Sequence, residues 1–452
     1  MQRRLLPSLG TTLARPIRRR SAYAIVVAAA VIPRLLVVAH ERSAVILPPE
    51  LVEKNVFFAR TFVHSGTFGY VPGVPSADDQ PLYGFFLIPL YWLFNGHWLS
   101  IALAQTALAA ATAVVVFEIA RVLFDSRWAV VAAVAATLNP YLLWHDVHVG
   151  REVLDGFVAA ALVLVLLLAL ERRSLRLAAL GGAVAGLAIL GNVRLELLPA
   201  VLVVLLLFAW RTRRQGLVAA VALVLASAVV VLPWMVRNRV QVGCFTLTTN
   251  AQALWKANNV NTDRVLAGGK WIDDVPLVLP PQHIVFGGKG QTRFTDECAA
   301  MRFYQHRVFE FWKKHPGQKA RIAARGVALL WDPRAQIFDE RGSNGAVLRP
   351  VSHLVNFGRI WVEGLYMGVL YALGLIGIFR AERRYVALAL SLLAYQTFAA
   401  ALFVGVTRYR APWDFLLVIL ATAGLAAVLT SATKRASAGE PRPRPRAVTT
   451  TR

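Results

Sequence analysis

The chain alternates between long apolar segments and short polar turns, and this pattern sets the predicted secondary structure. Ten segments are apolar along most of their length, and Leu, Val and Ala dominate in them. An α-helix needs about 20 residues to cross the ~30 Å hydrocarbon core of a bilayer. We therefore predict an α-helical polytopic membrane protein with about ten transmembrane helices, at 23–40, 98–122, 128–144, 153–170, 177–192, 195–210, 216–236, 358–379, 385–405 and 413–430.

A further apolar stretch, PLYGFFLIPLYWLF at 81–94, is short and contains two prolines. Its length favours a juxtamembrane helix lying at the interface. If this stretch does not cross, the cytoplasmic segments carry 23 basic residues against 4 acidic ones, and the rest of the chain carries 26 against 21. If it crosses, every later arginine-rich loop moves outside. The positive-inside rule favours the first arrangement, with both termini cytoplasmic.

This topology predicts five regions. The N-terminal segment is basic, and the helix after it has no small-residue cleavage site, so we interpret it as an uncleaved first span. The tail is rich in Pro and Arg and poor in apolar residues, which predicts disorder. The regions are a cytoplasmic N-terminus (1–22), a seven-helix membrane module (23–236) with an external loop (41–97), a small external α-rich domain (237–357), three C-terminal transmembrane helices (358–430) and a disordered cytoplasmic tail (431–452).

Composition supports this prediction and excludes other classes of protein. Hydrophobic residues make up 57% and charged residues 16%, whereas a typical soluble chain has about 25% charged residues. The net charge of +24 lies mainly in short loops between apolar segments, so we expect no nucleic-acid partner. Two cysteines exclude a Cys-rich metal site. They leave open a Cys244–Cys298 disulfide, which requires a Cα separation below ~7 Å.

Polar residues, most of them ionisable, gather at the predicted outer ends of the helices. They come from at least five separate segments, and ionisable groups in such positions usually face the bundle interior or a wet cavity. We therefore predict one shared cavity at the outer face. The residues are Glu50, Glu53, Asp78, Asp79, His145, Asp146, His148, Arg151, Glu152, Asp155, Arg194, Glu196, Arg237, Asn238, Arg239, Arg408 and Arg410.

Several of these residues allow two interpretations. His145, Asp146 and His148 have metal-ligand spacing, but a solvated turn also explains them. The pair Asp78 and Asp79 could bind a divalent cation, or form a turn before Gln-Pro. We expect no cofactor and no metal, with a divalent cation left open at these sites.

Four arginines near the outer ends carry more information: Arg194, Arg237, Arg408 and Arg410. Arginine at the outer face runs against the positive-inside rule. Guanidinium binds phosphate in a bidentate manner, which favours phosphate binding. Snorkelling toward lipid headgroups is the alternative.

A series of motifs follows in order along the chain. They are ELVEKNVFFARTFVHSGTFGY (50–70), QPLYGFFLIPLYWLFNG (80–96), LNPYLLWHDVHVGREVL (138–154), LAILGNVRLELLP (187–199), LPWMVRNRVQVGCFTLTTNAQALWKANN (232–259), FYQHRVFEFWKKHPGQKARIAARGVALLW (303–331) and VTRYRAP (406–412). This series resembles the lipid-linked-sugar glycosyltransferases of the GT-C fold, near the protein mannosyltransferase and aminoarabinose transferase group (glycosyltransferase family 39-like).

The resemblance implies where the functional residues lie. The family usually has an aspartate at the position of Leu51, so the catalytic base is assigned here to the neighbouring Glu50 and Glu53. Glu152 corresponds to a glutamate at the outer rim. The substrate-binding residues expected from the motifs and from the rim charges are Asp79, Tyr83, His148, Glu152, Arg194, Arg237, Asn238, Asn258, Arg408 and Arg410.

The implied activity is inverting transfer of a sugar from a polyprenyl-phosphate donor to an acceptor hydroxyl on the extracytoplasmic side of the cell inner membrane. A carboxylate takes the acceptor proton and arginines carry the phosphate charge. The acceptor is left open between a lipid, a protein and a polysaccharide. Two alternatives remain: a lipid-linked-sugar transporter, and a catalytically inactive envelope-assembly scaffold, which the residue at Leu51 keeps open.

Overall fold

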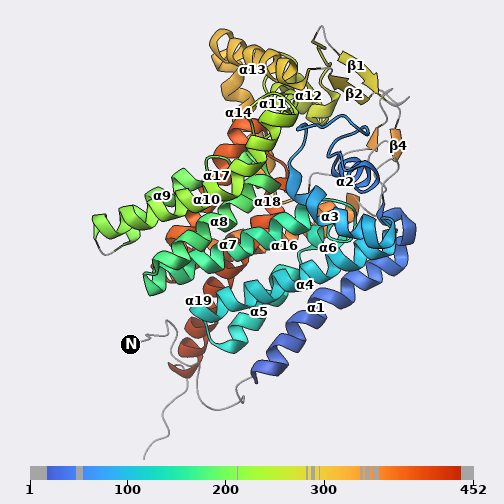
Figure 1. Cartoon of the computed structure of the whole chain (residues 1–452). Coiled ribbons are helices and arrows are strands. Elements are labelled where there is room, and N and C mark those ends of the chain that lie inside the picture. The colour runs from blue at the N-terminus through green and yellow to red at the C-terminus, as the bar shows by residue number, and fades with distance from the viewer. Residues whose placement is uncertain are drawn as a thin grey trace, which may run out of the picture.

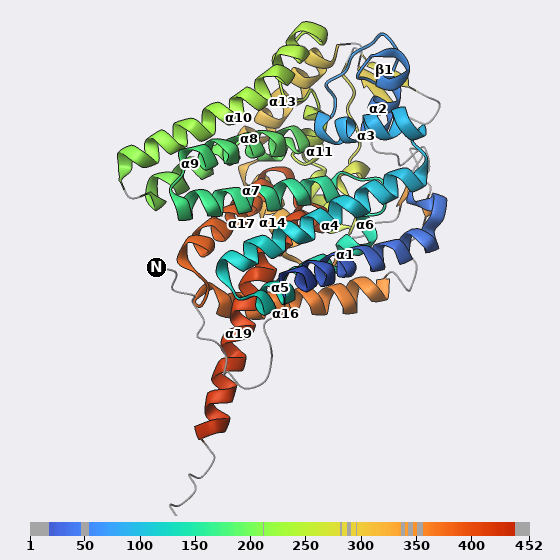
Figure 2. The same ribbon diagram turned by 60° about the horizontal axis from the view of Figure 1, so that its bottom comes forward.

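The structure of the protein is a computed structural model that describes residues 18–46, 54–210, 212–280, 283–286, 291–294, 296–335, 340–341, 347–349 and 356–438. These residues are almost entirely helical, with two short β-hairpins. Figures 1 and 2 show most of the helices gathered into one bundle, and Figure 1 shows a smaller helical unit at its upper end.

Seven helices in the described ranges are long and apolar enough to cross a membrane. Each coincides with one of the ten predicted spans, so the chain is a multi-pass membrane protein. Three of these spans combine a long helix with shorter elements: η1 extends α1, η4 leads into α16, and α18 and η5 lead into α19. The elements are α1 (Arg19–Glu41) with η1 (Arg42–Val45), α4 (Trp98–Leu123), α7 (Glu152–Arg172), α10 (Arg213–Gln241), the π-helical η4 (Gly358–Glu363) with α16 (Gly364–Ile378), α17 (Arg383–Phe403), and α18 (Thr407–Arg410) with η5 (Ala411–Trp413) and α19 (Asp414–Ala438).

The three remaining predicted spans form shorter helices. The segment 128–144 is interrupted: α5 (Ser126–Thr137) ends before Pro140, and Asn139 caps the separate α6 (Pro140–His145). Proline disfavours helical backbone in the residue before it, which explains the break. The other two are α8 (Leu175–Gly191), followed by η2 (Val193–Leu195), and α9 (Leu198–Ala209). The total of ten crossings therefore stays a prediction.

The long helices pack closely because small residues line several contacts. Helix α8 lies against α10 in both ribbon views. A Cβ added at Gly182 would lie 2.0 Å from the carbonyl oxygen of Leu223, so only glycine permits this approach. Small residues commonly let transmembrane helices approach in this way.

The first loop contributes two helices beside the bundle. They are α2 (Lys54–Ser65) and α3 (Pro81–Phe94), the latter at the bounds predicted for the juxtamembrane helix. The Asn55 side chain accepts a hydrogen bond from the backbone nitrogen of Gly84 at 3.0 Å and so joins the two helices. Whether α3 lies at the interface remains a prediction from its length.

The region after α10 folds into a helical unit with its own buried cluster. Trp255, Tyr304 and Val308 lie at the centre of this cluster. The unit matches the α-rich composition expected for 237–357, and its external location stays a prediction of the charge pattern. Its elements are α11 (Ala251–Lys256), α12 (Thr262–Ala267), η3 (Ile272–Asp274), the hairpin β1 (His283–Phe286) and β2 (Gln291–Phe294), α13 (Glu297–Lys314), α14 (Pro316–Trp331), and the hairpin β3 (Glu340–Arg341) and β4 (Val347–Arg349).

A disulfide fastens this unit to the membrane bundle. Cys244 and Cys298 are bonded, with their Cα atoms 5.9 Å apart. The sequence left this pairing open, and the structure forms it. The bond joins the turn after α10 to the first turn of α13.

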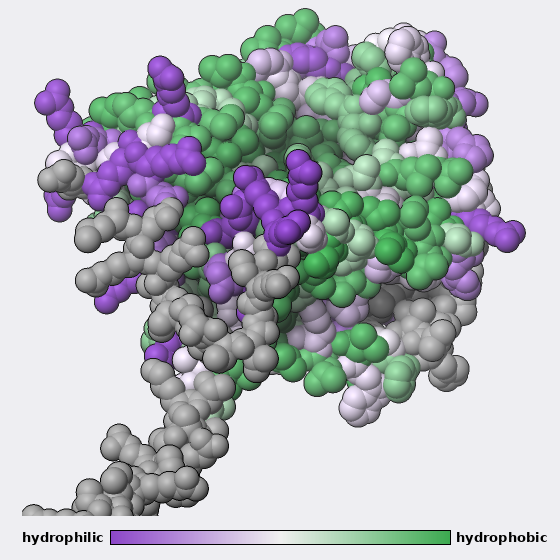
Figure 3. All heavy atoms as spheres, turned by 90° about the horizontal axis from the view of Figure 1, so that it is seen from below, coloured by the Kyte–Doolittle hydropathy of each residue, from purple (hydrophilic) through white to green (hydrophobic). Residues whose placement is uncertain are grey.

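The surface agrees with a membrane location. Figure 3 shows a broad apolar area on the face seen from below, with hydrophilic residues gathered mostly at its left side. Helix α19 continues to Ala438, eight residues into the region expected to be a disordered tail. The rest of that tail, and most of the basic N-terminus, lie outside the described residues.

Candidate functional site

The site is built around the start of α7, where several distant segments meet. Arg151 precedes this helix, and Glu152 and Asp155 occupy its first turn. Carboxylates in this position are stabilised by the positive end of the helix dipole. The turn 146–151 that leads into α7 is itself fixed from outside, because Gln105 Nε2 donates 2.7 Å hydrogen bonds to the carbonyl oxygens of Asp146 and His148.

The central contact is an ion pair between Glu152 and Arg408. Arg408 Nε donates to Glu152 Oε1 across 256 residues of sequence. The Glu152 side chain is only 7% exposed, whereas that of Arg408 is 38% exposed. The rim glutamate and one of the four rim arginines are therefore brought together, and the arginine is reachable from solvent.

Arg151 and Asp155 extend this contact toward the first loop. Arg151 Nη1 donates to Gln80 Oε1 at 2.7 Å, and Arg151 Nε lies 3.7 Å from Asp155 Oδ2. Burial lowers the pKa of Arg151, but the nearby Asp155, Tyr409 and Asp79 together raise it, so the net pKa is raised. A small pocket beside these residues is lined by Asp155, Asn192 and Arg408, among others.

Asp79 and Tyr83, from the first loop and the start of α3, also lie close to the start of α7. Asp79 is buried and accepts a 2.9 Å hydrogen bond from Asn55 Nδ2. The Tyr83 hydroxyl donates to Gln105 Oε1 at 2.6 Å and accepts from the backbone nitrogen of Gly150 at 3.0 Å. Tyr83 therefore supports the turn that precedes Glu152, because its hydroxyl is engaged by the chain itself.

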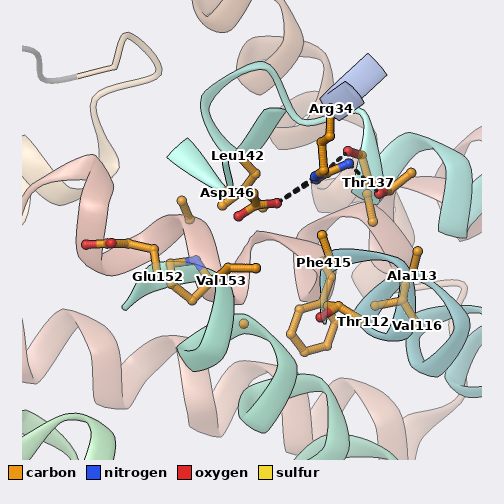
Figure 4. A pocket seen from close by; sticks show the side chains of 15 residues that line it. Arg34, Thr112, Ala113, Val116, Thr137, Leu142, Asp146, Glu152, Val153 and Phe415 are labelled. Carbon is orange, nitrogen blue, oxygen red and sulfur yellow. Dashed lines mark hydrogen bonds and ion pairs between the residues drawn. The ribbon is translucent and has the colours of Figure 1, made fainter. Parts of the chain in front are cut away.

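Arg34 supports the same turn from inside α1. Its guanidinium donates to Asp146 Oδ2 at 2.6 and 3.0 Å and to Thr137 Oγ1 at 3.1 Å. Figure 4 shows Asp146 between Arg34 and Glu152, along a pocket that Phe415 also lines. The sequence offered a signal for this residue, since a charge within an apolar span is costly and needs a partner.

The two histidines show no sign of a metal centre. His145 stacks on Tyr141, and burial, with help from His148 and Arg408, lowers the pKa of His145 to about 3. His148 Nδ1 lies 2.7 Å from the carbonyl oxygen of Trp144, and its Nε2 lies 3.6 Å from Glu41 Oε2. Within the described ranges no group of three or more His, Cys, Asp or Glu side chains is placed to hold a metal ion.

Three of the predicted substrate-binding residues instead hold the fold together. Arg237 donates 2.8 Å hydrogen bonds to the carbonyl oxygens of Ser76 and Phe68, which ties α10 to the first loop. Asn238 donates to the carbonyl oxygen of Thr246. Asn258 is fully buried and bonds the backbone of Leu402. Their side chains face the chain's own backbone, so a role in contacting substrate is a prediction without geometric support.

Arg410 and Arg194 are also engaged by the chain. Arg410 is 1% exposed and donates to Asp414 Oδ1 at 3.0 Å and to the carbonyl oxygens of Leu330 and Asp332. Arg194 donates to the carbonyl oxygens of Phe403 and Val404 and lies 3.5 Å over the ring of Tyr409. Of the four rim arginines, Arg408 is the one whose contacts suit a ligand site.

The two residues assigned as catalytic base, Glu50 and Glu53, lie outside the described residues. The next residue in the chain, Lys54, binds Asp78 Oδ2 at 2.7 Å. Asp78 also accepts a hydrogen bond from the hydroxyl of Tyr70 at 2.7 Å. The start of α2 is therefore joined to the segment 78–80, which contains Gln80, the partner of Arg151.

Residues 78–235 match the sequence profile of the family described as dolichyl-phosphate-mannose-protein mannosyltransferase. This part of the chain is similar to that family. The matched segment contains Glu152 and Arg151, and the resemblance inferred from the motifs is confirmed for it. A comparison with curated protein sequences finds no match.

Solved structures of similar shape come from an archaeal oligosaccharyltransferase, AglB from Archaeoglobus fulgidus. Its complex with an inhibitory peptide and a dolichol-phosphate matches with a TM-score of 0.50 and 15% identity, over 94% of this chain and 52% of that chain. The apo form matches with a TM-score of 0.50 and 15% identity, over 94% and 53%. The form tethered to an acceptor peptide matches with a TM-score of 0.50 and 12% identity, over 94% and 51%.

The chain thus spans about half the length of the oligosaccharyltransferase that it resembles. At this identity the likeness concerns the fold alone, and it agrees with the GT-C fold expected from the motifs. The profile match adds that residues 78–235 are similar to a family of glycosyltransferases.

Proposed function

We propose that the protein transfers a sugar from a polyprenyl-phosphate donor to an acceptor hydroxyl, at the extracytoplasmic side of the cell inner membrane. The family profile over residues 78–235 supports a donor of this class. The similar oligosaccharyltransferase has been solved with a dolichol-phosphate, which agrees with a lipid phosphate in a fold of this kind.

The chemistry requires two kinds of group. A carboxylate removes the proton of the acceptor hydroxyl as its oxygen bonds to the anomeric carbon of the sugar, and the bond from that carbon to the phosphate oxygen breaks. A positive group stabilises the departing polyprenyl phosphate. One such displacement inverts the anomeric configuration. The arginines can supply the positive charge without a metal.

The observation that carries the proposal is the Glu152–Arg408 pair at the start of α7. A guanidinium that is 38% exposed can still reach a phosphate, while the buried Glu152 holds one edge of it. Arginine suits this task because its planar group can bind two phosphate oxygens at once. Arg151 and Arg194 add positive charge nearby, and burial together with Arg151 and Arg408 lowers the pKa of Arg194 to about 10.

The base is assigned to Glu50, with Glu53 as the second choice. The order of residues along the chain supports this assignment, because Glu53 directly precedes Lys54, whose ammonium is bound to Asp78. Asp79 and Gln80 follow, and Gln80 accepts from Arg151. The residue that follows Glu53 therefore connects through a short path of contacts to Arg151, which precedes Glu152.

The decisive experiment supplies the purified protein with a labelled polyprenyl-phosphate sugar in vesicles. A glycosyltransferase releases free polyprenyl phosphate and labels an acceptor. A transporter moves the donor across the bilayer unaltered, and an inactive scaffold does neither. Transport without release of polyprenyl phosphate would reject the proposal.

Two variants identify the base in the same assay. Glu50→Gln keeps the shape of the side chain and removes the basic oxygen, so we expect it to lose most turnover. Glu53→Gln is the matched comparison three residues further along the chain. If both variants transfer sugar at the parent rate, neither carboxylate is the base. Mass spectra of envelope lipids and glycans, with and without the protein, identify the acceptor as a lipid, a protein or a polysaccharide.

A further inference from the structure

The carboxyl end of α17 is held by three side chains from outside that helix. The last four carbonyl groups of a helix lack intrahelical partners and need others. Lys319 Nζ donates to the carbonyl oxygens of Ala401 and Leu402 at 2.8 and 3.2 Å. Asn258 Nδ2 donates to the carbonyl oxygen of Leu402 at 3.0 Å, and Arg194 donates to the carbonyl oxygens of Phe403 and Val404. We call this set of contacts the α17 clamp.

Lys319 and Asn258 act as one unit within the clamp. Lys319 Nζ donates to Asn258 Oδ1 at 2.6 Å, and Trp312 Nε1 donates to the same oxygen at 2.9 Å. These residues belong to α14, α13 and the turn after α11. The clamp therefore connects the helical unit after α10 to the bundle.

The backbone directly after α17 is strained. Val404 has a φ of 66°, which is a clear outlier for a β-branched residue. Strained backbone of this kind costs of order 1–3 kcal/mol and persists only where the surroundings fix it. The Val404 side chain is 1% exposed and packs in a cluster with Phe311 and Ile322, so the helical unit holds it.

Helix α14 also presses against this turn. A Cβ added at Gly326 would lie 2.6 Å from the carbonyl oxygen of Ala400 and 3.1 Å from the Cα of Val404. The two backbones are therefore in direct contact. At the other end of the segment, Arg410 donates to the carbonyl oxygen of Leu330 in the last turn of α14 and to that of Asp332, directly after this helix. Residues 401–410 are fixed to α14 at both ends, and Arg408 lies between them.

We propose that Lys319 is a positioning residue for Arg408: through the α17 clamp, the helical unit after α10 sets the distance between Arg408 and Glu152. The inference rests on the proposed function for its catalytic consequence. Lys319 does not contact the Glu152–Arg408 pair, so it acts through the backbone of 401–408. Transfer chemistry is sensitive to such placement, because a shift of about 1 Å can cost about a hundredfold in rate.

The first test measures geometry and needs no activity. Glu152→Cys and Arg408→Cys are combined in one chain, and a short bifunctional thiol reagent joins them, while the native cysteines stay protected in their disulfide. We expect Lys319→Met to lower the cross-linking yield severalfold and Lys319→Arg to restore it. Arg321→Met is the matched control, since it removes a cation from the same helix that is 68% exposed and pairs with Asp263.

The second test follows sugar transfer in chains that keep Glu152 and Arg408. We expect Lys319→Met to raise the donor KM about tenfold, because a misplaced guanidinium binds the phosphate less well. Lys319→Arg should return the KM toward the parent value, and Arg321→Met should leave it unchanged. If the parent chain shows no transfer at all, the proposed function fails, whereas the cross-linking result still decides the positioning role.

The outcome that overturns the inference is parent-like cross-linking in Lys319→Met. Should that variant fail to fold, Val404→Gly tests the same clamp with the lysine in place. Glycine accepts the positive φ without strain but removes the side chain that anchors the turn. We expect the yield to fall here too, and a parent-like yield in Val404→Gly would equally overturn the proposal.

Discussion

Arg408 and Arg410 lie two residues apart in the four-residue helix α18, yet their surroundings are opposite. Arg410 is buried with Asp414 and Glu363 and also bonds two carbonyl oxygens and the hydroxyl of Tyr371. Arg408 pairs with Glu152 and keeps 38% of its side chain exposed. The same residue type in the same motif therefore serves the fold at one position and offers a ligand contact at the other.

The largest effect should come from removing the buried cation. Arg410→Leu leaves Asp414 and Glu363 in the bundle without their positive partner. Removing one member of a buried ion pair typically costs about 3–5 kcal/mol. We expect a much lower melting temperature in detergent and a reduced yield of monodisperse protein. A parent-like melting curve would show that the Arg410 cluster does not stabilise the fold.

A substitution at the exposed Arg408 should lower activity and leave stability unchanged. Arg408→Lys keeps the charge but loses the bidentate fork. We expect at least about a tenfold loss of transfer, equivalent to ~1.4 kcal/mol, with an unchanged melting temperature. Arg239→Lys, at the same end of the bundle, is the control. Full transfer by Arg408→Lys would leave lipid snorkelling as the better explanation of this arginine.

A double-mutant cycle then measures the pair itself. Glu152→Gln and Arg408→Lys are made singly and together, and transfer is compared among the four chains. Because the two side chains are in contact, we expect a coupling energy of about 0.5–3 kcal/mol. Purely additive losses would mean that Glu152 and Arg408 act independently, which contradicts the contact in the structure.

The smallest effect concerns the lysine that holds the segment carrying both arginines. Burial lowers the pKa of Lys319 to about 8, below the ~10.4 of a free lysine. Between these values the unfolded chain binds more protons than the folded chain, so this group makes stability rise as the pH increases from 8 to 10. We expect the melting temperature of the parent, relative to Lys319→Met, to rise slightly over that range. A constant difference would contradict the lowered pKa.

Much of the fold could be predicted from the apolar pattern, and the exceptions have a physical cause. Seven predicted spans correspond to long helices because fifteen or more apolar residues can satisfy their backbone only as a helix in lipid. The pattern failed within 128–144, where Pro140 divides one apolar segment into α5 and α6. Hydropathy alone could not distinguish these two pieces from one crossing helix.

The candidate site was predicted less completely. The charge pattern predicted that Glu152 and Arg408 line one shared polar site, because ionisable groups in a membrane protein usually face such a site. In the structure the two side chains are in contact. Residue type could not show that Arg237 and Asn258 bond backbone carbonyls, since those partners lie in distant segments. Lys319 carried no sequence signal beyond its place on an amphipathic helix.

The Arg34–Asp146 pair has a consequence for how the chain is made. Arg34 lies within the first long helix, but its partner is 112 residues further along the chain. The ribosome adds about 5–20 residues per second, so roughly 6 to 22 seconds pass between the synthesis of Arg34 and that of Asp146. An unpaired arginine at the centre of a helix costs about 2.5–3.5 kcal/mol on insertion scales. We expect the first helix to stay in the translocation channel, or at its edge, until Asp146, which lies just before α7, has been synthesised.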